Sequence, residues 1–268
     1  MKLNFVKLSP TRNITILITD PIPRDMHASL AEALMDGDCV GGEQVGYIEA
    51  PSIPGARARL QMMGGEFCGN ASMSLAAWLA YCDGLADGAD RDYPLEVSGA
   101  DGLVSCRILR RGSAYEGTVA MPVPACIREE ELGGQRFPVV HFPGISHIII
   151  PESALTPGEA KARIAKWCDQ LNAEALGILL LNEAWDEFIP LVYVRSTESA
   201  VWEHGCGSGT AAIGAYAASL RRENVQLSLS QPGGVIHVEA RQQDGVVTGL
   251  KITGTIKITA QGTAWADV

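Results

Sequence analysis

Two similar stretches, each centred on a Cys-Gly pair, constrain the fold of this chain more than any other feature. The first reads MMGGEFCGNASMSLAAWLAYCDG around Cys68, and the second reads VWEHGCGSGTAAIGAYAASLRR around Cys206. In both, small residues follow the cysteine and lead into a run of Ala, Leu, Ile, Met and aromatic residues that is apolar on nearly all sides. Because a helix of that composition has to be buried all round, the sequence predicts two enclosed helices, one in each half of the chain.

The similarity of the two halves continues downstream of both predicted helices. The segments PLEVSGADGLVSCRILRRGSAYEGTVAMP and QLSLSQPGGVIHVEARQQDGVVTGLKITG alternate apolar and polar residues around Gly-rich turns, which is typical of antiparallel strands. The fold class predicted is α+β, with two pseudo-symmetric halves, each a curved, mostly antiparallel sheet or barrel wrapped around a central helix. An outer helix is expected at Pro157–Gln170. Other strands are expected at Thr15–Thr19, Val45–Glu49, Ala56–Met62, Ile145–Ile150, Gly177–Leu181 and Phe188–Val194.

The segment MPVPAC, at Pro122–Cys126, is the predicted boundary between the halves. The first domain is expected at residues 1–123, and a strand around Gly254–Ala260, within residues 254–268, is expected to return to it. The second domain is expected at residues 124–253.

Composition and charge exclude several classes of function. The net charge of −10 argues against binding to nucleic acid, whose phosphates require a basic surface. No apolar run approaches the roughly 18 residues of a membrane span, and MKLNFVKLSPTRN lacks the apolar core of a secretory signal. We therefore expect a cytoplasmic protein that binds neither nucleic acid nor membranes.

The seven cysteines do not form a recognisable disulfide or zinc pattern. Their number is odd, and no CxxC pair occurs. Five of them lack a following glycine and are expected to serve in packing: Cys39, Cys82, Cys106, Cys126 and Cys168.

Cys68 and Cys206 have the surroundings that a reactive thiol needs. A cysteine directly before a helix lies at the positive end of the helix dipole, which lowers a thiol pKa from about 8.5 toward neutrality. Backbone N–H groups at a helix start also form an anion site that suits a carboxylate. One such motif alone is better explained by a buried residue that begins a helix, but two matched copies favour catalysis. One thiolate would remove an α-proton from one face of an amino acid, and the other thiol would return a proton to the opposite face, without pyridoxal phosphate or any other cofactor and without a metal.

The motifs GGEFCGNAS and EHGCGSGTAA are similar to the two active-site motifs of the diaminopimelate epimerase fold family, and the duplicated layout resembles that family over almost the whole chain. The resemblance implies that Cys68 and Cys206 are the catalytic acid and base. It also implies that the substrate carboxylate binds to helix-start donors from Gly69, Asn70, Gly207 and Ser208. Asn13, in SPTRNITILI, lies where the family has a substrate-binding Asn, and His147, in PGISHIII, resembles a family His.

Two departures from the diaminopimelate epimerase pattern bear on the substrate. The family's Arg that clamps the distal carboxylate has no counterpart in TESAVWEHG; Arg195 lies three residues further upstream and would replace it only in a rebuilt loop. Met62 takes the place of a family Asn. Within the superfamily, the chain is most similar to the histidine racemases of staphylopine-type metallophore pathways, through GGEFCGN and WExxCGSGT. Glu43 and Glu203 are then expected to contact an imidazole or an ammonium group, unless they are ordinary surface charges.

The expected function is therefore racemisation of an amino acid, with L-histidine to D-histidine favoured. A diaminopimelate epimerase with a rebuilt distal site and a racemase of another amino acid remain alternatives. Isomerases of the phenazine-biosynthesis type lack the two cysteines, and proline racemases carry Cys-Gly-His at the first motif. A non-catalytic amino-acid-binding protein has no need of two thiols. The expected partner is a small-molecule amino acid, and a homodimer is an oligomeric state that the sequence allows.

Overall fold

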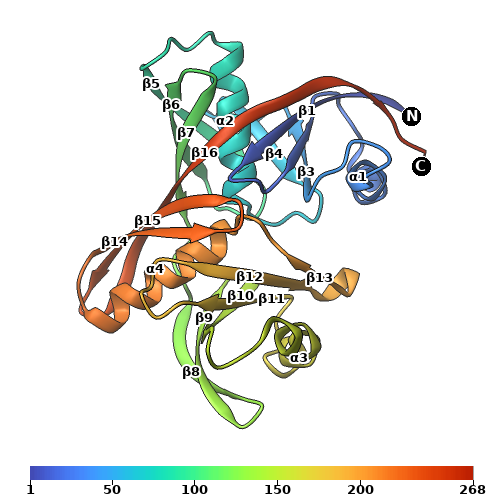
Figure 1. The fold of residues 1–268 in the computed structure, drawn as a ribbon. Coiled ribbons are helices and arrows are strands. Elements are labelled where there is room, and N and C mark those ends of the chain that lie inside the picture. The colour runs from blue at the N-terminus through green and yellow to red at the C-terminus, as the bar shows by residue number, and fades with distance from the viewer. Residues whose placement is uncertain (268) are drawn as a thin grey trace. The chain divides into compact units, whose positions relative to one another are not determined.

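A computed structural model describes residues 1–267 of the chain. The fold is mixed α/β and rich in strands, and the chain divides into two compact units. Unit 1 comprises Met1–Ala120 and the segment that begins at Thr253, and unit 2 comprises Met121–Ile252. Strand β16 (Val246–Trp265), drawn in red tones in Figure 1, therefore belongs to both units.

Unit 1 is built on one sheet with the strand order β1-β2-β3-β4-β5-β6-β7, and the far end of β16 pairs antiparallel with β1. The pairs β2–β3 and β4–β5 are parallel, and the other neighbouring pairs with a recorded register are antiparallel. A parallel pair needs a long crossover, and helices α1 and α2 lie in these two crossovers. The bounds are β1 (Lys2–Pro10), β2 (Thr15–Ile18), α1 (His27–Met35), β3 (Gln44–Glu49), β4 (Ala58–Met62), α2 (Gly69–Cys82), β5 (Asp90–Val97), β6 (Leu103–Arg111) and β7 (Ala114–Met121), with a short 3-10 helix at Arg24–Met26.

Helix α2 is the buried helix that the sequence predicts after Cys68. It packs against β1, β2, β4, β5 and β6, and it runs beside the strands of unit 1 in Figure 1. Gly117 on β7 allows close packing, since a Cβ there would lie 3.1 Å from the Cβ of Met73 on α2. The prediction of an enclosed helix is confirmed for this half.

Helix α1 is a part of unit 1 that the sequence-based predictions omit. It follows two prolines, Pro21 and Pro23, and has only nine residues, so its periodic signal is short. Its apolar face nevertheless places Leu30 and Leu34 in one buried cluster with residues of β2 and β3, including Ile16. Helix α1 is thus held by packing against the sheet rather than by its own propensity.

Unit 2 contains a six-stranded sheet with the order β13-β12-β11-β10-β9-β8, in which only the β10–β11 pair is parallel among the described pairings. Strands β14 and β15 form an antiparallel hairpin, and β16 follows β15 in strand order. The bounds are β8 (Cys126–Leu132), β9 (Gln135–Phe142), β10 (Ile145–Pro151), α3 (Pro157–Gln170), β11 (Ala175–Leu181), β12 (Phe188–Val194), β13 (Ser199–Trp202), α4 (Gly207–Arg221), β14 (Val225–Gln231) and β15 (Gly234–Gln243), with a 3-10 helix at Arg195–Thr197.

Helix α3 has the bounds that the sequence predicts, and it forms the crossover between β10 and β11. A capping box begins it: the Thr156 hydroxyl accepts from the Glu159 N–H, and the Glu159 carboxylate accepts from the Thr156 N–H. Ile164 and Trp167 pack in one buried cluster with sheet residues such as Ile178.

Helix α4 is the second buried helix that the sequence predicts. It packs against β9, β10, β14 and β15. Gly214 lies where α4 touches β15, since a Cβ there would lie 2.5 Å from a methyl carbon of Val238.

The strands predicted from sequence are present, with ends that differ by a few residues. Strand β16 extends well beyond the predicted Gly254–Ala260 on both sides. None of the helices in the described part of the chain is long and apolar enough to cross a membrane.

Candidate active site

Cys68 occupies the N-cap position of α2. Its backbone is extended, with φ −133° and ψ 113°, and the helix begins at Gly69. The Cys68 Sγ accepts from the Ala71 N–H at 3.4 Å, which satisfies one of the N–H groups that a helix start leaves unbonded. The Cys68 carbonyl accepts from the Ser72 hydroxyl at 2.7 Å. The predicted helix start at this cysteine is confirmed.

A network of side-chain amides surrounds the Cys68 thiol. The thiol donates to Gln44 Oε1 at 2.9 Å, and Gln44 Nε2 donates to Asn13 Oδ1 at 2.7 Å. Asn13 Nδ2 donates to Glu43 Oε2 at 2.7 Å, and Asn70 Nδ2 donates to Asn13 Oδ1 at 3.1 Å. The structure thus brings Asn13, Glu43 and Asn70, all predicted as site residues, into one network with Cys68.

Gln44 contacts the Cys68 thiol and is absent from the sequence-based predictions. The sequence places it directly after Glu43, in GGEQVGYI, where the first residue of β3 follows a polar run. That pair of polar residues before an apolar strand was the available signal. It does not specify which side chain faces the cysteine, because this depends on the parallel pairing of β3 with β2.

Cys206 occupies the matching position on α4. Its φ is −104° and its ψ is 104°, and its Sγ accepts from the Gly209 N–H at 3.3 Å. The Ser208 hydroxyl lies 3.5 Å from Sγ. Gly209 makes room for the sulfur, since a Cβ there would lie 3.2 Å from Sγ and 2.8 Å from Leu179 Cδ2. Here too the predicted helix start is confirmed.

Two residues that the sequence-based predictions omit fix the backbone of Cys206. The Cys206 N–H donates to Gln231 Oε1 at 2.6 Å, and Gln231 Nε2 donates to Thr210 Oγ1 at 3.0 Å. Thr210 Oγ1 in turn donates to the Cys206 carbonyl at 2.7 Å. Gln231 ends β14 and is remote in sequence from Cys206, so no local pattern could reveal this contact.

The expectation of a lowered thiol pKa is wrong for Cys206. The side chain is only 3% exposed, and this burial raises the pKa of the Cys206 thiol well above its usual range. The charge of Glu203 and a hydrogen bond to it raise the pKa further, whereas Ser208 and the Gly209 N–H lower it only in part. Loss of hydration therefore outweighs the helix start, and the raised pKa favours the thiol form of Cys206.

Glu203, predicted as a substrate-binding residue, lies in the segment that precedes α4 and raises the pKa of Cys206. Its N–H donates to the Pro190 carbonyl at 3.0 Å, and the neighbouring His204 carbonyl accepts from the Gly233 N–H at 2.7 Å. Unit 2 therefore gathers Glu203, Gly207 and Ser208 around its cysteine, as unit 1 gathers its own predicted residues around Cys68.

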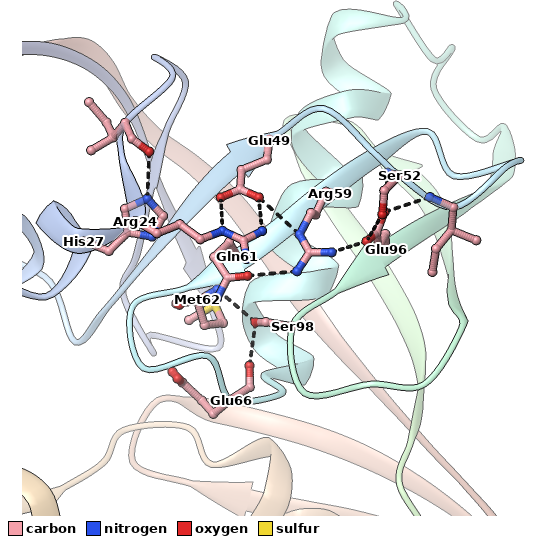
Figure 2. A network of polar contacts seen from close by, with 12 residues as sticks. Arg24, His27, Glu49, Ser52, Arg59, Gln61, Met62, Glu66, Glu96 and Ser98 are labelled. Atoms are coloured by element: carbon pink, nitrogen blue, oxygen red, sulfur yellow. Dashed lines mark hydrogen bonds and ion pairs between the residues drawn. The ribbon is translucent and has the colours of Figure 1, made fainter.

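The segment before Cys68 is braced by the turn that follows β5. The Ser98 hydroxyl donates to the Glu66 carbonyl at 2.8 Å and accepts from the Met62 N–H at 3.0 Å, as Figure 2 shows. Gly99, with φ +70°, lies so close that a Cβ would be 2.3 Å from the Phe67 nitrogen. Because only glycine allows this approach, the turn fixes the backbone that leads to Cys68.

An ion-pair network in Figure 2 ties this brace to the rest of the sheet. Glu96 is 4% exposed and accepts from the Ser52 N–H, the Ser52 hydroxyl, the Ile53 N–H and Arg59. Burial alone would raise the pKa of Glu96, but the bonds from Ser52 and Ile53 and the charge of Arg59 lower it to about 2. Arg59 also pairs with Glu49 at 3.2 Å.

The two residues at which the chain departs from the diaminopimelate epimerase pattern, Met62 and Arg195, have structural roles in this fold. Met62 is fully buried on β4. Arg195 pairs with Asp169 at 3.0 Å and donates to the Cys168 carbonyl at 3.0 Å, so it stabilises the end of α3. Neither residue provides a cationic clamp for a distal carboxylate.

His147 is buried within β10. Neither ring nitrogen has a hydrogen-bond partner among the described residues, and burial lowers the pKa of His147 to about 3. Gly177 on the paired strand β11 makes room for the ring, since a Cβ there would lie 2.1 Å from Nδ1. Within residues 1–267, no group of three or more His, Cys, Asp and Glu side chains is arranged to hold a metal ion.

Comparison with known proteins places the chain in a family. Residues 2–265 match the family described as the histidine racemase CntK N-terminal domain. A histidine racemase of Staphylococcus aureus (strain Mu50) is 32% identical over 99% of this chain and 98% of that protein. A histidine racemase of Fusobacterium nucleatum subsp. nucleatum (strain ATCC 23726) is 31% identical over 97% of this chain and 96% of that protein.

The fold has solved relatives at much lower identity. A hydroxyproline epimerase from Agrobacterium vitis, with bound trans-4-hydroxy-L-proline, superposes with a TM-score of 0.70 at 13% identity, covering 99% of this chain and 93% of that one. That likeness extends to the fold alone. The family matches almost the whole length of the chain, and two full-length relatives are more than 30% identical to it. The chain therefore belongs to the histidine racemase family and is an isomerase.

Proposed function

We propose that the chain interconverts L- and D-histidine without a cofactor, using Cys68 and Cys206 as the acid and the base. The observation that carries the proposal is that each cysteine caps a buried helix and accepts a backbone N–H on its sulfur, one in each unit. Membership of the histidine racemase family supports the substrate.

In the proposed mechanism the two thiols act on opposite faces of one α-carbon. One cysteine, as thiolate, takes the α-proton and becomes a thiol, leaving a carbanion. The other cysteine gives its proton to the opposite face and becomes a thiolate. Backbone N–H groups at the helix starts, from Gly69, Asn70, Gly207 and Ser208, would hold the substrate carboxylate and stabilise the charge that develops on it.

The protonated state of Cys206 requires that substrate binding assist its ionisation. Burial is the main cause of the raised pKa, and the charge of Glu203 adds to it. We propose that the substrate's ammonium group or protonated imidazole binds next to Glu203 and offsets that negative charge. Binding would then favour the thiolate only when a cation is in place, which limits reaction of the thiol in the empty site.

The surroundings of the two cysteines favour histidine over diaminopimelate. Glu43 lies in the Cys68 network and Glu203 acts on Cys206, so both cysteines have a carboxylate nearby. An imidazole can donate to a carboxylate and carry positive charge, whereas a second carboxylate on the substrate would be repelled. Arg195, the one arginine near the family position, pairs with Asp169 instead.

The substrate proposal is tested by incubating the pure protein, after treatment with a chelator and without pyridoxal phosphate, with single amino acids. Chiral chromatography should detect D-histidine from L-histidine and the reverse reaction. L,L- and meso-diaminopimelate should turn over at least about 100-fold more slowly, because a site built for one side chain rejects another that leaves its polar groups unpaired. Faster turnover of diaminopimelate than of histidine would overturn the substrate and leave the two-cysteine mechanism standing.

We also propose that the chain is a duplicated structure with two pseudo-symmetric halves as its domains. The first comprises residues 1–123 and a returning strand that lies within residues 254–265, and the second comprises residues 124–253. The buried helix after a Cys-Gly pair in each unit supports this. The seven cysteines form no disulfide within the described residues, which suits a reducing compartment and supports a cytoplasmic location. The homodimer and a role in metallophore biosynthesis stay predictions, which sedimentation analysis and the neighbouring genes would test.

A further inference from the structure

The donor and acceptor atoms of the hydrogen bonds around Cys68 can be assigned one after another, starting from Glu43. An ionised carboxylate only accepts hydrogen bonds. Asn13 Nδ2 lies 2.7 Å from Glu43 Oε2, so the amide nitrogen of Asn13 must face Glu43. The amide oxygen of Asn13 therefore points the other way, into the network, where it accepts from Asn70 Nδ2 at 3.1 Å.

The orientation of Asn13 fixes that of Gln44. Gln44 Nε2 donates to Asn13 Oδ1 at 2.7 Å and to Thr15 Oγ1 at 2.7 Å. The Thr15 hydroxyl uses its own proton on the Asn13 main-chain carbonyl at 3.3 Å, so toward Gln44 it can only accept. Both protons of the Gln44 amide are thus used, and its oxygen is the atom left to face Cys68.

The Gln44 carbonyl oxygen lies 2.9 Å from Cys68 Sγ. A carbonyl oxygen cannot donate, so the sulfur must donate, and it can do so only as a thiol. The Ala71 N–H acts in the opposite sense, but at the longer distance of 3.4 Å. The shorter contact favours the protonated sulfur, because a hydrogen bond from the neutral form stabilises that form.

We propose that Gln44 is a positioning residue that, oriented through Asn13 by Glu43, holds Cys68 in the thiol form in the substrate-free protein. Cys68 then enters the reaction as the proton donor in the direction in which Cys206 is the base; in the reverse direction Cys68, left as the thiolate, takes the proton. The catalytic meaning of this inference rests on the proposed function, whereas the state of the thiol does not.

The test is the rate at which iodoacetamide alkylates Cys68 at neutral pH, followed for each cysteine by mass spectrometry of peptides. Only the thiolate reacts, so the rate reports the ionised fraction. Gln44→Leu removes the acceptor, and Cys68 should react about fivefold faster, the usual worth of one hydrogen bond. Gln44→Glu places a negative acceptor at the same point, and Cys68 should react at least about fivefold more slowly.

Gln61→Leu is the matched control, because Gln61 lies opposite Tyr47 in the β3–β4 pair and bonds to Arg59 and the Met62 carbonyl instead of Cys68. Its Cys68 rate should equal that of the unchanged protein, and exposed Cys39 and Cys82 serve as internal references in every variant. An unchanged or slower rate in a folded Gln44→Leu variant, or a faster rate in Gln44→Glu, would overturn the inference. If Gln44→Leu does not fold, the alkylation rate of Cys68 in Gln44→Glu tests the inference by itself. No substrate is used, so failure of histidine racemisation leaves this result intact.

Discussion

His147 is a buried base that has no hydrogen-bond partner among residues 1–267 to stabilise its charged form, and this makes the stability of the chain depend on pH. Its pKa is about 3 in the folded protein, against 6.5 for an ordinary histidine. Below pH 6.5 the unfolded chain binds a proton that the folded chain does not, so stability is lost as the pH falls. The loss should approach about 1.4 kcal/mol per pH unit.

The prediction is checked by urea unfolding of the protein and of His147→Leu between pH 6.5 and 4.5. The unchanged protein should lose about 2 to 3 kcal/mol relative to the variant over this range. Glu96 acts in a separate window, because its folded pKa of about 2 lies below its ordinary value, so its contribution is lost only as the pH falls below about 4.5. Parallel pH curves for the protein and the variant would show that His147 is not buried as a neutral ring.

The site residues that sequence reasoning could identify are those with a local signal. Cys68 and Cys206 each precede a glycine and an apolar run, and Asn70 lies in the same motif. Gln44 reaches Cys68 through the pairing of β3 with β2, and Gln231 reaches Cys206 from the end of β14, so no local pattern shows that their side chains face the cysteines. The state of Cys206 was predicted wrongly because burial, which a sequence does not show, outweighs the helix start.

At the scale of elements, one glycine of α3 and one glycine of α4 allow the effect of helix propensity to be separated from the effect of packing. Gly214 on α4 faces Val238, and a Cβ would lie 2.5 Å from one of its methyl carbons. Gly158 on α3 has nothing within 4 Å of such a Cβ. Alanine is the better helix former by about 1 kcal/mol, so the two sites should respond in opposite directions.

Gly214→Ala should lower the free energy of unfolding by about 1 to 2 kcal/mol, because a clash with a β-branched side chain outweighs the gain in propensity. Gly158→Ala should raise it by about 0.5 to 1 kcal/mol. Urea unfolding of the two variants beside the unchanged protein measures both. A stabilising Gly214→Ala would mean that α4 does not pack on β15 as closely as the structure has it.

The element-scale predictions succeed where the sequence has a sharp boundary. Helix α3 begins at a Thr-Pro-Gly-Glu run that forms a capping box, and its ends were predicted to the residue. Helix α1 was missed because nine residues after two prolines give a short pattern, which only its packing against β2 and β3 makes helical. The predicted strand Gly254–Ala260 covers only the middle of β16, because the sequence-based prediction divided this stretch between a strand of the second half and a returning strand, whereas the structure makes it one continuous strand.

At the scale of the whole molecule, the chain repeats one arrangement: a cysteine, a glycine and a buried helix, once in each unit. This local repeat is visible in the sequence because both helix starts carry the same kind of small residues after the cysteine. The proposed racemisation needs both copies, since one thiol must take a proton while the other gives one. A structural role for either cysteine would leave the reaction with a single base.

Labelling of histidine in D2O, with the protein and its single-cysteine variants, tests this claim most directly. Early in the reaction from L-histidine, the D-histidine formed should carry α-deuterium while the remaining L-histidine keeps its proton. Cys68→Ser and Cys206→Ser should each lower racemisation at least about 100-fold, the scale of one lost acid or base, whereas Cys126→Ser at an exposed position should not. Racemisation at the unchanged rate by either active-site variant, or deuterium entering L-histidine as fast as D-histidine appears, would contradict the two-cysteine account.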